Sequence, residues 1–291
     1  MAALVAASLV PDERRGPAIA SIILGLTIAN IAGVPVSTAI GQHWGWRGTF
    51  AVVAALGLLT IVAVRCTVPF LPGGHAGGIA GELGALRHGQ FWLAVAICVV
   101  GCGGMFAVYT YISSTLIEVS GISRGWIPAV LALFGVGMTI GTVVGGRLAD
   151  RSVLGTVAFG LVAVAAAMAG FTVLVRYPAI AVVGVVLLGM LCMTVMPSMQ
   201  ARLLDVAPGA PTLAASMIHS AANTANAIGA GAGGLVLSAG AGYAAIGWVG
   251  AAMAVGGLVL SCLATALARH TRVVIPHDQG PETKEGHRSV R

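Results

Sequence analysis

Eight long apolar segments follow one another along this 291-residue sequence, and they constrain its fold more than any other feature. They cover residues 17–42, 46–68, 91–117, 126–147, 153–175, 178–200, 211–238 and 244–268. A helix needs roughly 20 mostly apolar residues to cross the hydrocarbon core of a bilayer. In that core the backbone polar groups must be bonded internally, which favours the α-helix. The sequence therefore predicts an all-α, polytopic membrane helical bundle with about eight full transmembrane helices.

The composition points to the same environment. Hydrophobic residues make up 58% of the chain and charged residues 8%, whereas soluble domains contain about 25% charged residues. The net charge of +6 could indicate a nucleic-acid partner, but the basic residues lie between the apolar segments and form no single patch. We therefore expect the lipid bilayer as a partner and no nucleic acid.

The positions of the basic residues predict the topology. If Arg14 and Arg15 are cytoplasmic, 12 of the 15 Lys and Arg residues fall on the cytoplasmic side, in agreement with the positive-inside rule. We expect a multi-pass protein of the plasma (cytoplasmic) membrane. The parts predicted to be cytoplasmic are the loops 11–16, 69–90, 147–152 and 200–211 and the C-terminal tail.

The longest connection divides the chain. Residues 69–90 are rich in Pro and Gly, which is typical of a flexible linker. It separates residues 1–68 from residues 91–272, which contain six of the predicted spans. The polar tail, 273–291, is expected to be disordered.

Two groups of residues are typical of helices that change their contacts. Pro35 removes a backbone hydrogen bond and bends the first full span, while the glycines beside it allow a close neighbour. In the turn after the fourth full span, Asp150 can cap a helix or pair with an arginine. The alternatives are packing glycines in a rigid bundle and an ordinary charged turn. The predicted conformational residues are Gly25, Gly33, Pro35, Gly41, Gly146, Asp150 and Arg151.

One predicted span carries a polar stripe. Its members are Thr212, Ser216, His219, Asn223 and Asn226. Their spacing places all five on one face of a helix. Polar side chains at membrane depth face protein or a watery cavity, so the stripe either lines a substrate cavity or joins helices by hydrogen bonds. His219 is the ionisable side chain in the middle of a span, and it is either a proton-coupling group or a neutral hydrogen-bonding residue.

Other side chains are predicted to line the same substrate cavity. Met190 and Met193 belong to a methionine stripe that suits varied apolar ligands, although a plain core stripe fits equally well. Tyr109 and Tyr111 belong either to the cavity or to the aromatic belt at the membrane surface. The predicted cavity residues are Asn30, Tyr109, Tyr111, Met190, Met193, Ser216, His219, Asn223 and Asn226.

The sequence gives no indication of an enzyme, of a bound cofactor or of a metal site. It contains no Walker motif, HExxH or GxSxG. Cys98 and Cys102 lie one helical turn apart, but no His, Asp or Glu lies close in sequence to complete a metal site. The five cysteines are therefore interpreted as small apolar core residues.

Several stretches resemble a known family. They are Gly25-Leu26-Thr27-Ile28-Ala29-Asn30 with Gly33-Val34-Pro35, Tyr109-Thr110-Tyr111-Ile112, Gly146-Arg147-Leu148-Ala149-Asp150-Arg151, and His219-Ser220-Ala221 with Asn223 and Asn226. They are similar to parts of the major facilitator superfamily, in particular the twelve-span drug:proton antiporters of the sugar-efflux and chloramphenicol-efflux type. Ser37 and Ser152-Val153-Leu154 depart from the family pattern.

The resemblance implies a secondary active transporter. It would export a small, apolar molecule (a drug, antibiotic or sugar-like compound) in exchange for protons, with the proton gradient as the driving force, by alternating access. In the family's register the chain begins inside span four, as an N-terminally truncated sequence that lacks about three and a half spans. Residues 1–68 would then be a remnant of the N-terminal bundle, and 91–272 a C-terminal six-helix bundle. The alternative is a non-transporting remnant, or a bundle that must pair with another chain or with itself.

Overall fold

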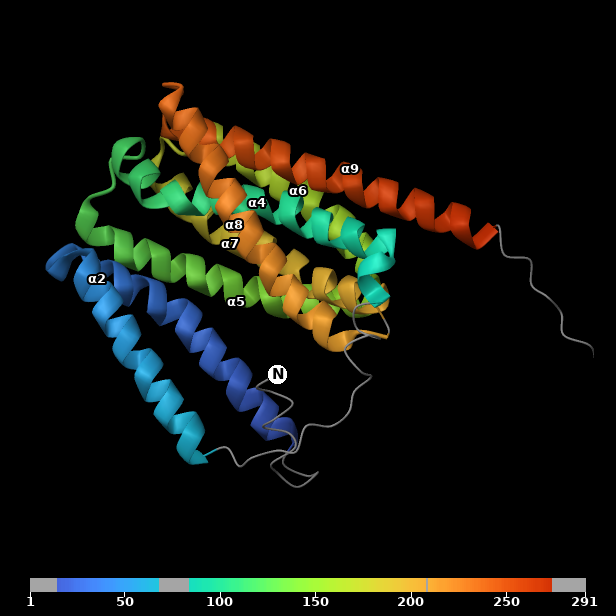
Figure 1. Ribbon diagram of the computed structural model, residues 1–291. Coiled ribbons are helices and arrows are strands. Elements are labelled where there is room, and N and C mark those ends of the chain that lie inside the picture. The colour runs from blue at the N-terminus through green and yellow to red at the C-terminus, as the bar shows by residue number, and fades with distance from the viewer. Residues whose placement is uncertain (1–14, 68–83, 208, 274–291) are drawn as a thin grey trace, which may run out of the picture.

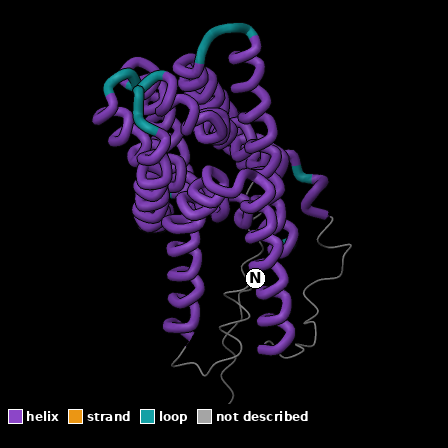
Figure 2. The backbone as a smooth tube through the Cα atoms, turned by 90° about the vertical axis from the view of Figure 1, so that its left-hand side faces the viewer, coloured by secondary structure: helices purple, strands orange, loops and turns teal. Residues whose placement is uncertain are grey.

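A computed structural model describes residues 15–67, 84–207 and 209–273 of the chain. Within these ranges the chain is helical apart from short connections, and no strand occurs (Figures 1 and 2). The long helices are α2 (Arg15–Thr67), α4 (Gly89–Glu118), α5 (Ile127–Arg151), α6 (Val153–Leu174), α7 (Pro178–Asp205), α8 (Pro211–Ser238) and α9 (Ile246–Val273). Short 3-10 turns are η2 (Ala85–Arg87), η3 (Arg124–Trp126) and η4 (Tyr243–Ala245). The prediction of an all-α membrane bundle is confirmed.

Some predictions fall on residues that the structure does not describe. Most of the predicted linker, 69–90, lies in the stretch 68–83. The predicted tail lies almost entirely in 274–291, and the apolar start of the chain in 1–14. These three predictions remain predictions.

Two of the predicted spans, 17–42 and 46–68, are the limbs of the helical hairpin α2 (Figure 1). The limbs meet at Gly45, whose φ of 72° and ψ of 174° interrupt the helix. Glycine adopts a positive φ without the steric cost of a Cβ atom. Near the turn, the Thr49 hydroxyl donates a hydrogen bond to the Ser37 carbonyl oxygen at 3.3 Å and joins the two limbs.

Helices α4 to α9 form a single bundle (Figure 1). In it, α4 contacts α8 and α9, α5 contacts α7, and α6 contacts α7 and α9. Six of the described helices are long and apolar enough to cross a membrane. Helix α8 is not among them, although it has 28 residues, because its polar side chains lower its hydropathy. Each predicted span nevertheless coincides with a helix or a helix limb.

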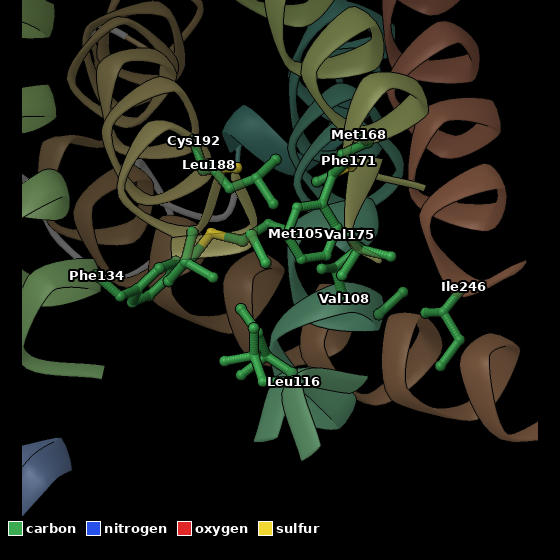
Figure 3. Packing of buried hydrophobic residues seen from close by; sticks show 14 of the residues in the cluster. Met105, Val108, Leu116, Phe134, Met168, Phe171, Val175, Leu188, Cys192 and Ile246 are labelled. Atoms are coloured by element: carbon green, nitrogen blue, oxygen red, sulfur yellow. The ribbon is translucent and has the colours of Figure 1, made fainter. Parts of the chain in front are cut away.

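The core of the bundle is apolar, and so is much of its outer surface. Met105 from α4, Phe134 from α5 and Leu188 from α7 meet in one buried cluster (Figure 3). On the outside, Phe159, Val183 and Leu235 are 69%, 65% and 72% exposed. A bilayer solvates such side chains, whereas water would not. The burial pattern therefore fits a multi-pass membrane protein.

The contact between α5 and α7 is the most extensive in the bundle and depends on glycine. A Cβ atom added at any of three glycines of α5 would overlap a backbone carbonyl oxygen of α7. The pairs are Gly137 with Val186, Gly141 with Met190, and Gly145 with Thr194. Both helices advance by four residues from pair to pair, so they run parallel in a fixed register. Small residues allow such close approach between membrane helices. We call these six residues the α5–α7 glycine ladder.

The hairpin α2 is attached to the bundle through α5 (Figure 1). At the tip of the hairpin, the Gln42 side-chain amide donates a hydrogen bond to the Arg124 carbonyl oxygen at 3.1 Å. This bond joins α2 to the 3-10 turn that precedes α5. The predicted conformational residues of α2 therefore belong to a hairpin that packs on α5. Helix α5 in turn carries the other predicted conformational residues, Gly146, Asp150 and Arg151, at its C-terminal end.

Candidate functional site

The polar stripe of α8, Thr212, Ser216, His219, Asn223 and Asn226, lies on an exposed face of the described chain. The opposite face of α8 is formed by small and apolar residues, and it is buried. The buried residues are Ala214, Ile218, Ala221, Ala225, Gly229 and Gly233. Gly229 packs directly on the Gly103 carbonyl oxygen of α4, with no room for a Cβ atom. Because the small residues turn toward α4, the polar stripe turns away from it.

The hydrogen bonds of the stripe divide it into two parts. The Ser216 hydroxyl donates to the Leu213 carbonyl oxygen of its own helix at 2.9 Å. The side chains of His219, Asn223 and Asn226 form no hydrogen bond with any described residue. Their imidazole and amide groups can therefore bind a solute, water or further protein. The stripe offers donors and acceptors in a helix that is otherwise apolar.

The two predicted tyrosines lie in different surroundings. Tyr109 stacks on Phe134 of α5, with ring centroids 4.9 Å apart and an interplanar angle of 24°. The Tyr111 hydroxyl donates to the Ala230 carbonyl oxygen of α8 at 3.0 Å, and its ring lies on Gly233. Tyr109 thus joins α4 to α5, while Tyr111 joins α4 to α8. The structure gives both residues a packing contact and does not bring them to one face.

The methionines do not lie together with the polar stripe. Met190 belongs to the α5–α7 glycine ladder through its backbone. Met193 lines a small internal cavity between α4, α6 and α7, and no residue of α8 is among the lining residues. The side chain of Asn30 lies outside what the structure describes. Of the predicted cavity residues, Ser216, His219, Asn223 and Asn226 are therefore the ones that share a surface.

The predicted conformational residues lie mainly along α2 and at the end of α5. Gly25, Gly33 and Gly146 have open space where a Cβ atom would be, and Pro35 is inside α2. Gly41 lies against the Thr49 side chain of the second limb, 3.3 Å from an added Cβ atom. Asp150 and Arg151 are exposed, and within the described ranges neither forms an ion pair. Their role in a conformational change stays a prediction.

Sequence reasoning missed the contacts that fix the bundle. Gly137, Gly141 and Gly145 recur at steps of four residues, which is the pattern of a close helix contact in membranes. This pattern could have predicted the ladder, but it could not have named α7 as the partner. The hydrogen bond from Gln42 to Arg124 joins residues 82 positions apart, and no local signal in the sequence indicates it.

Known proteins resemble the chain over most of its length. The inner membrane transport protein YdhP of Escherichia coli K12 is 39% identical over 254 residues, which cover 87% of this chain and 65% of that protein. The uncharacterized transporter YfhI of Bacillus subtilis is 33% identical over 268 residues, 91% of this chain and 66% of its own length. A chloramphenicol resistance protein of Streptomyces lividans is 33% identical over 251 residues, covering 81% of this chain and 60% of that protein.

The chain thus spans less than two thirds of the length of each of these relatives. The family model of the Major Facilitator Superfamily matches residues 1–234, which include the hairpin α2, most of the bundle and the polar stripe of α8. The match agrees with the expectation that the chain is not an enzyme. The chain is a multi-pass membrane protein and belongs to the Major Facilitator Superfamily.

Proposed function

We propose that the chain serves in a secondary active transporter that exports a small apolar molecule in exchange for protons. The observation that carries the proposal is the exposed polar stripe of α8. Three of its side chains, His219, Asn223 and Asn226, form no hydrogen bond with described residues. Unpaired polar groups at membrane depth are costly unless they face water, a ligand or protein. A transport pathway supplies the first two.

The relatives support efflux of a drug-like compound. One of them is named a chloramphenicol resistance protein, and another an inner membrane transport protein. Amide groups such as those of Asn223 and Asn226 can donate and accept hydrogen bonds at once. An apolar solute with a few hydrogen-bonding groups suits a surface that combines them with apolar neighbours. We place drugs, antibiotics and sugar-like compounds in this class.

Proton exchange is assigned to His219. Histidine is the side chain whose unperturbed charge change falls closest to neutral pH, and intramembrane ionisable residues are typical of proton relays. His219 is exposed on the stripe between Ser216 and Asn223. A proton bound there would change the charge of the surface to which the solute binds. This change in charge would couple the movement of the proton to the movement of the solute.

The orientation follows from charge. One end of the helices carries Arg147, Arg151 and Arg202, and the other carries Arg124 and Arg176. By the positive-inside rule, we assign the first end to the cytoplasmic side of the plasma membrane. In an alternating-access cycle, the bond from Gln42 to Arg124 would belong to a state closed on the opposite side.

The test is transport by the chain reconstituted in vesicles. With an outward-acting proton gradient, accumulation of labelled chloramphenicol is expected to rise above that of empty vesicles. Asn223→Ala and Asn226→Ala are expected to lower it by about 10-fold, because the loss of a buried polar contact to a ligand costs about 1.4 kcal/mol. Leu235→Ala is the matched control, because Leu235 is exposed on the same helix outside the stripe.

Two outcomes distinguish the alternatives. Unchanged transport by the two asparagine variants would show that the polar stripe of α8 does not line the transport pathway. A folded chain that transports nothing but associates with itself or with a second bundle would favour the alternative, a non-transporting bundle that needs a partner chain.

A further inference from the structure

Sulfur-containing side chains gather around one internal cavity of the bundle. The cavity has a volume of about 20 Å³ and lies between α4, α6 and α7. Half of its lining residues contain sulfur, namely Cys102, Met105, Cys192, Met193 and Met196. These residues come from two helices that are far apart in the sequence. The fold therefore brings together sulfur atoms that the linear sequence shows only as scattered cysteines and a methionine stripe.

Two of these sulfur atoms are in contact. The Cys102 thiol donates to the Met196 thioether, with the two sulfur atoms 3.8 Å apart. Cys98 lies one turn away on the same buried face of α4 and is 0% exposed. The other lining residues have glycine, aliphatic or phenyl side chains. Sulfur is thus the donor atom that the lining side chains offer.

Sulfur donors select among metal ions. Among the described residues, no group of three or more His, Cys, Asp or Glu side chains is placed to hold a metal ion. Magnesium, calcium and manganese prefer oxygen ligands, whereas thiolates and thioethers favour soft ions. We propose that this sulfur-lined cavity binds one soft monovalent metal ion of the Cu(I) or Ag(I) class, through Cys102, Cys192 and Met196.

A monovalent ion can bind at this site without adding net charge. When the ion binds, one thiol loses its proton to solvent, and the thiolate–metal bond forms. A single thiolate with a monovalent ion is neutral, so it adds no net charge to an apolar interior, where an unpaired charge is costly. A divalent ion would need both Cys102 and Cys192 as thiolates for the same balance. The Met196 thioether then favours the monovalent ion, because thioethers are ligands of soft ions such as Cu(I).

The spacing of two of the three proposed ligands agrees with one bound ion. Two sulfur atoms that share an ion at about 2.3 Å each, the length of a zinc–sulfur bond, lie about 3.8–4.0 Å apart at tetrahedral to trigonal angles. The distance from Cys102 to Met196 is 3.8 Å. The cavity has the volume of about one water-sized sphere. Three of the lining residues, Phe106, Met193 and Met196, are partly exposed.

The experiment uses the full chain, purified in detergent under reducing conditions and titrated with Ag(I) and with Cu(I) against a chelator of known affinity. We expect one ion per chain and an X-ray absorption spectrum with sulfur neighbours alone. Cys102→Ser and Met196→Leu are each expected to weaken binding by about 10-fold or more, because even outer-shell substitutions at metal sites have effects of this size.

Matched controls come from the exposed cysteines. Cys66 and Cys262 are exposed and lie outside the cavity, so Cys66→Ser and Cys262→Ser are expected to leave the affinity unchanged. Met196→Leu conserves volume and hydrophobicity, so it carries the test if Cys102→Ser does not fold. Binding that survives Met196→Leu, binding that is lost in either control, or zinc bound as tightly as Ag(I) would each overturn the proposal.

Discussion

Gly141 of α5 lies directly against the backbone carbonyl oxygen of Met190 of α7, with no space for a Cβ atom between them. The Thr194 hydroxyl strengthens this contact by donating to the Gly141 carbonyl oxygen at 3.2 Å. The stability of the bundle should therefore depend on the absence of a side chain at position 141. The register between α5 and α7 also fixes the end of α5, where the predicted conformational residues Asp150 and Arg151 lie.

Gly141→Ala is expected to lower the stability of the bundle by about 1–3 kcal/mol, the typical cost of overpacking. The measurement is thermal unfolding of the purified protein in detergent. Gly146→Ala is the matched control on the same helix, because open space surrounds position 146. There the alanine should be neutral or stabilising by up to about 1 kcal/mol. Equal unfolding temperatures for the two variants would contradict the ladder.

Tyr111→Phe tests the bond between α4 and α8. Removal of the hydroxyl leaves the Ala230 carbonyl oxygen without this donor. We expect a loss of about 0.5–1.5 kcal/mol, observed as a lower unfolding temperature. Tyr177→Phe should have no effect, because Tyr177 is 61% exposed. A Tyr111 variant as stable as the parent would show that the bond adds nothing measurable to helix packing.

His219→Gln tests the proposed proton coupling. Glutamine keeps the capacity for hydrogen bonding but cannot gain a proton at neutral pH. Uptake into vesicles should then no longer respond to the proton gradient, while exchange of labelled for unlabelled solute continues. Ser220→Ala is the control on the next position of α8, since the Ser220 hydroxyl only donates within its own helix, to Ser216 at 3.5 Å. A full response of the glutamine variant to the gradient would exclude His219 as the coupling group.

The sequence predicted the helices well and their neighbours poorly. Apolar length alone located a helix or a helix limb for every predicted span, because the bilayer sets the length of a helix. The step pattern of His219, Asn223 and Asn226 also predicted a common face, and the structure shows that face exposed. Contacts between helices depend on long-range packing, so neither the partner of Gly141 nor the meeting of Cys102 with Met196 could be predicted. For the same reason, the hydrogen bond from the Tyr111 hydroxyl to the Ala230 carbonyl oxygen of α8 could not be predicted.

Gly45→Ala tests the turn of the α2 hairpin. Position 45 has open space around it, so the expected cost comes from its φ of 72° alone.

With a ψ of 174°, this backbone conformation is essentially restricted to glycine, and an L-residue there costs roughly 1–3 kcal/mol.

The change should loosen the tip of the hairpin, where Gln42 bonds to Arg124. The measurement is hydrogen exchange of the backbone around residues 41–49, which should become faster.

Gly57→Ala is the matched control in the second limb, because position 57 is helical and also open. Alanine there should slow exchange or leave it unchanged, since it favours the helix by about 1 kcal/mol over glycine. If both variants exchanged alike, the positive φ at Gly45 would not be what holds the two limbs in a hairpin.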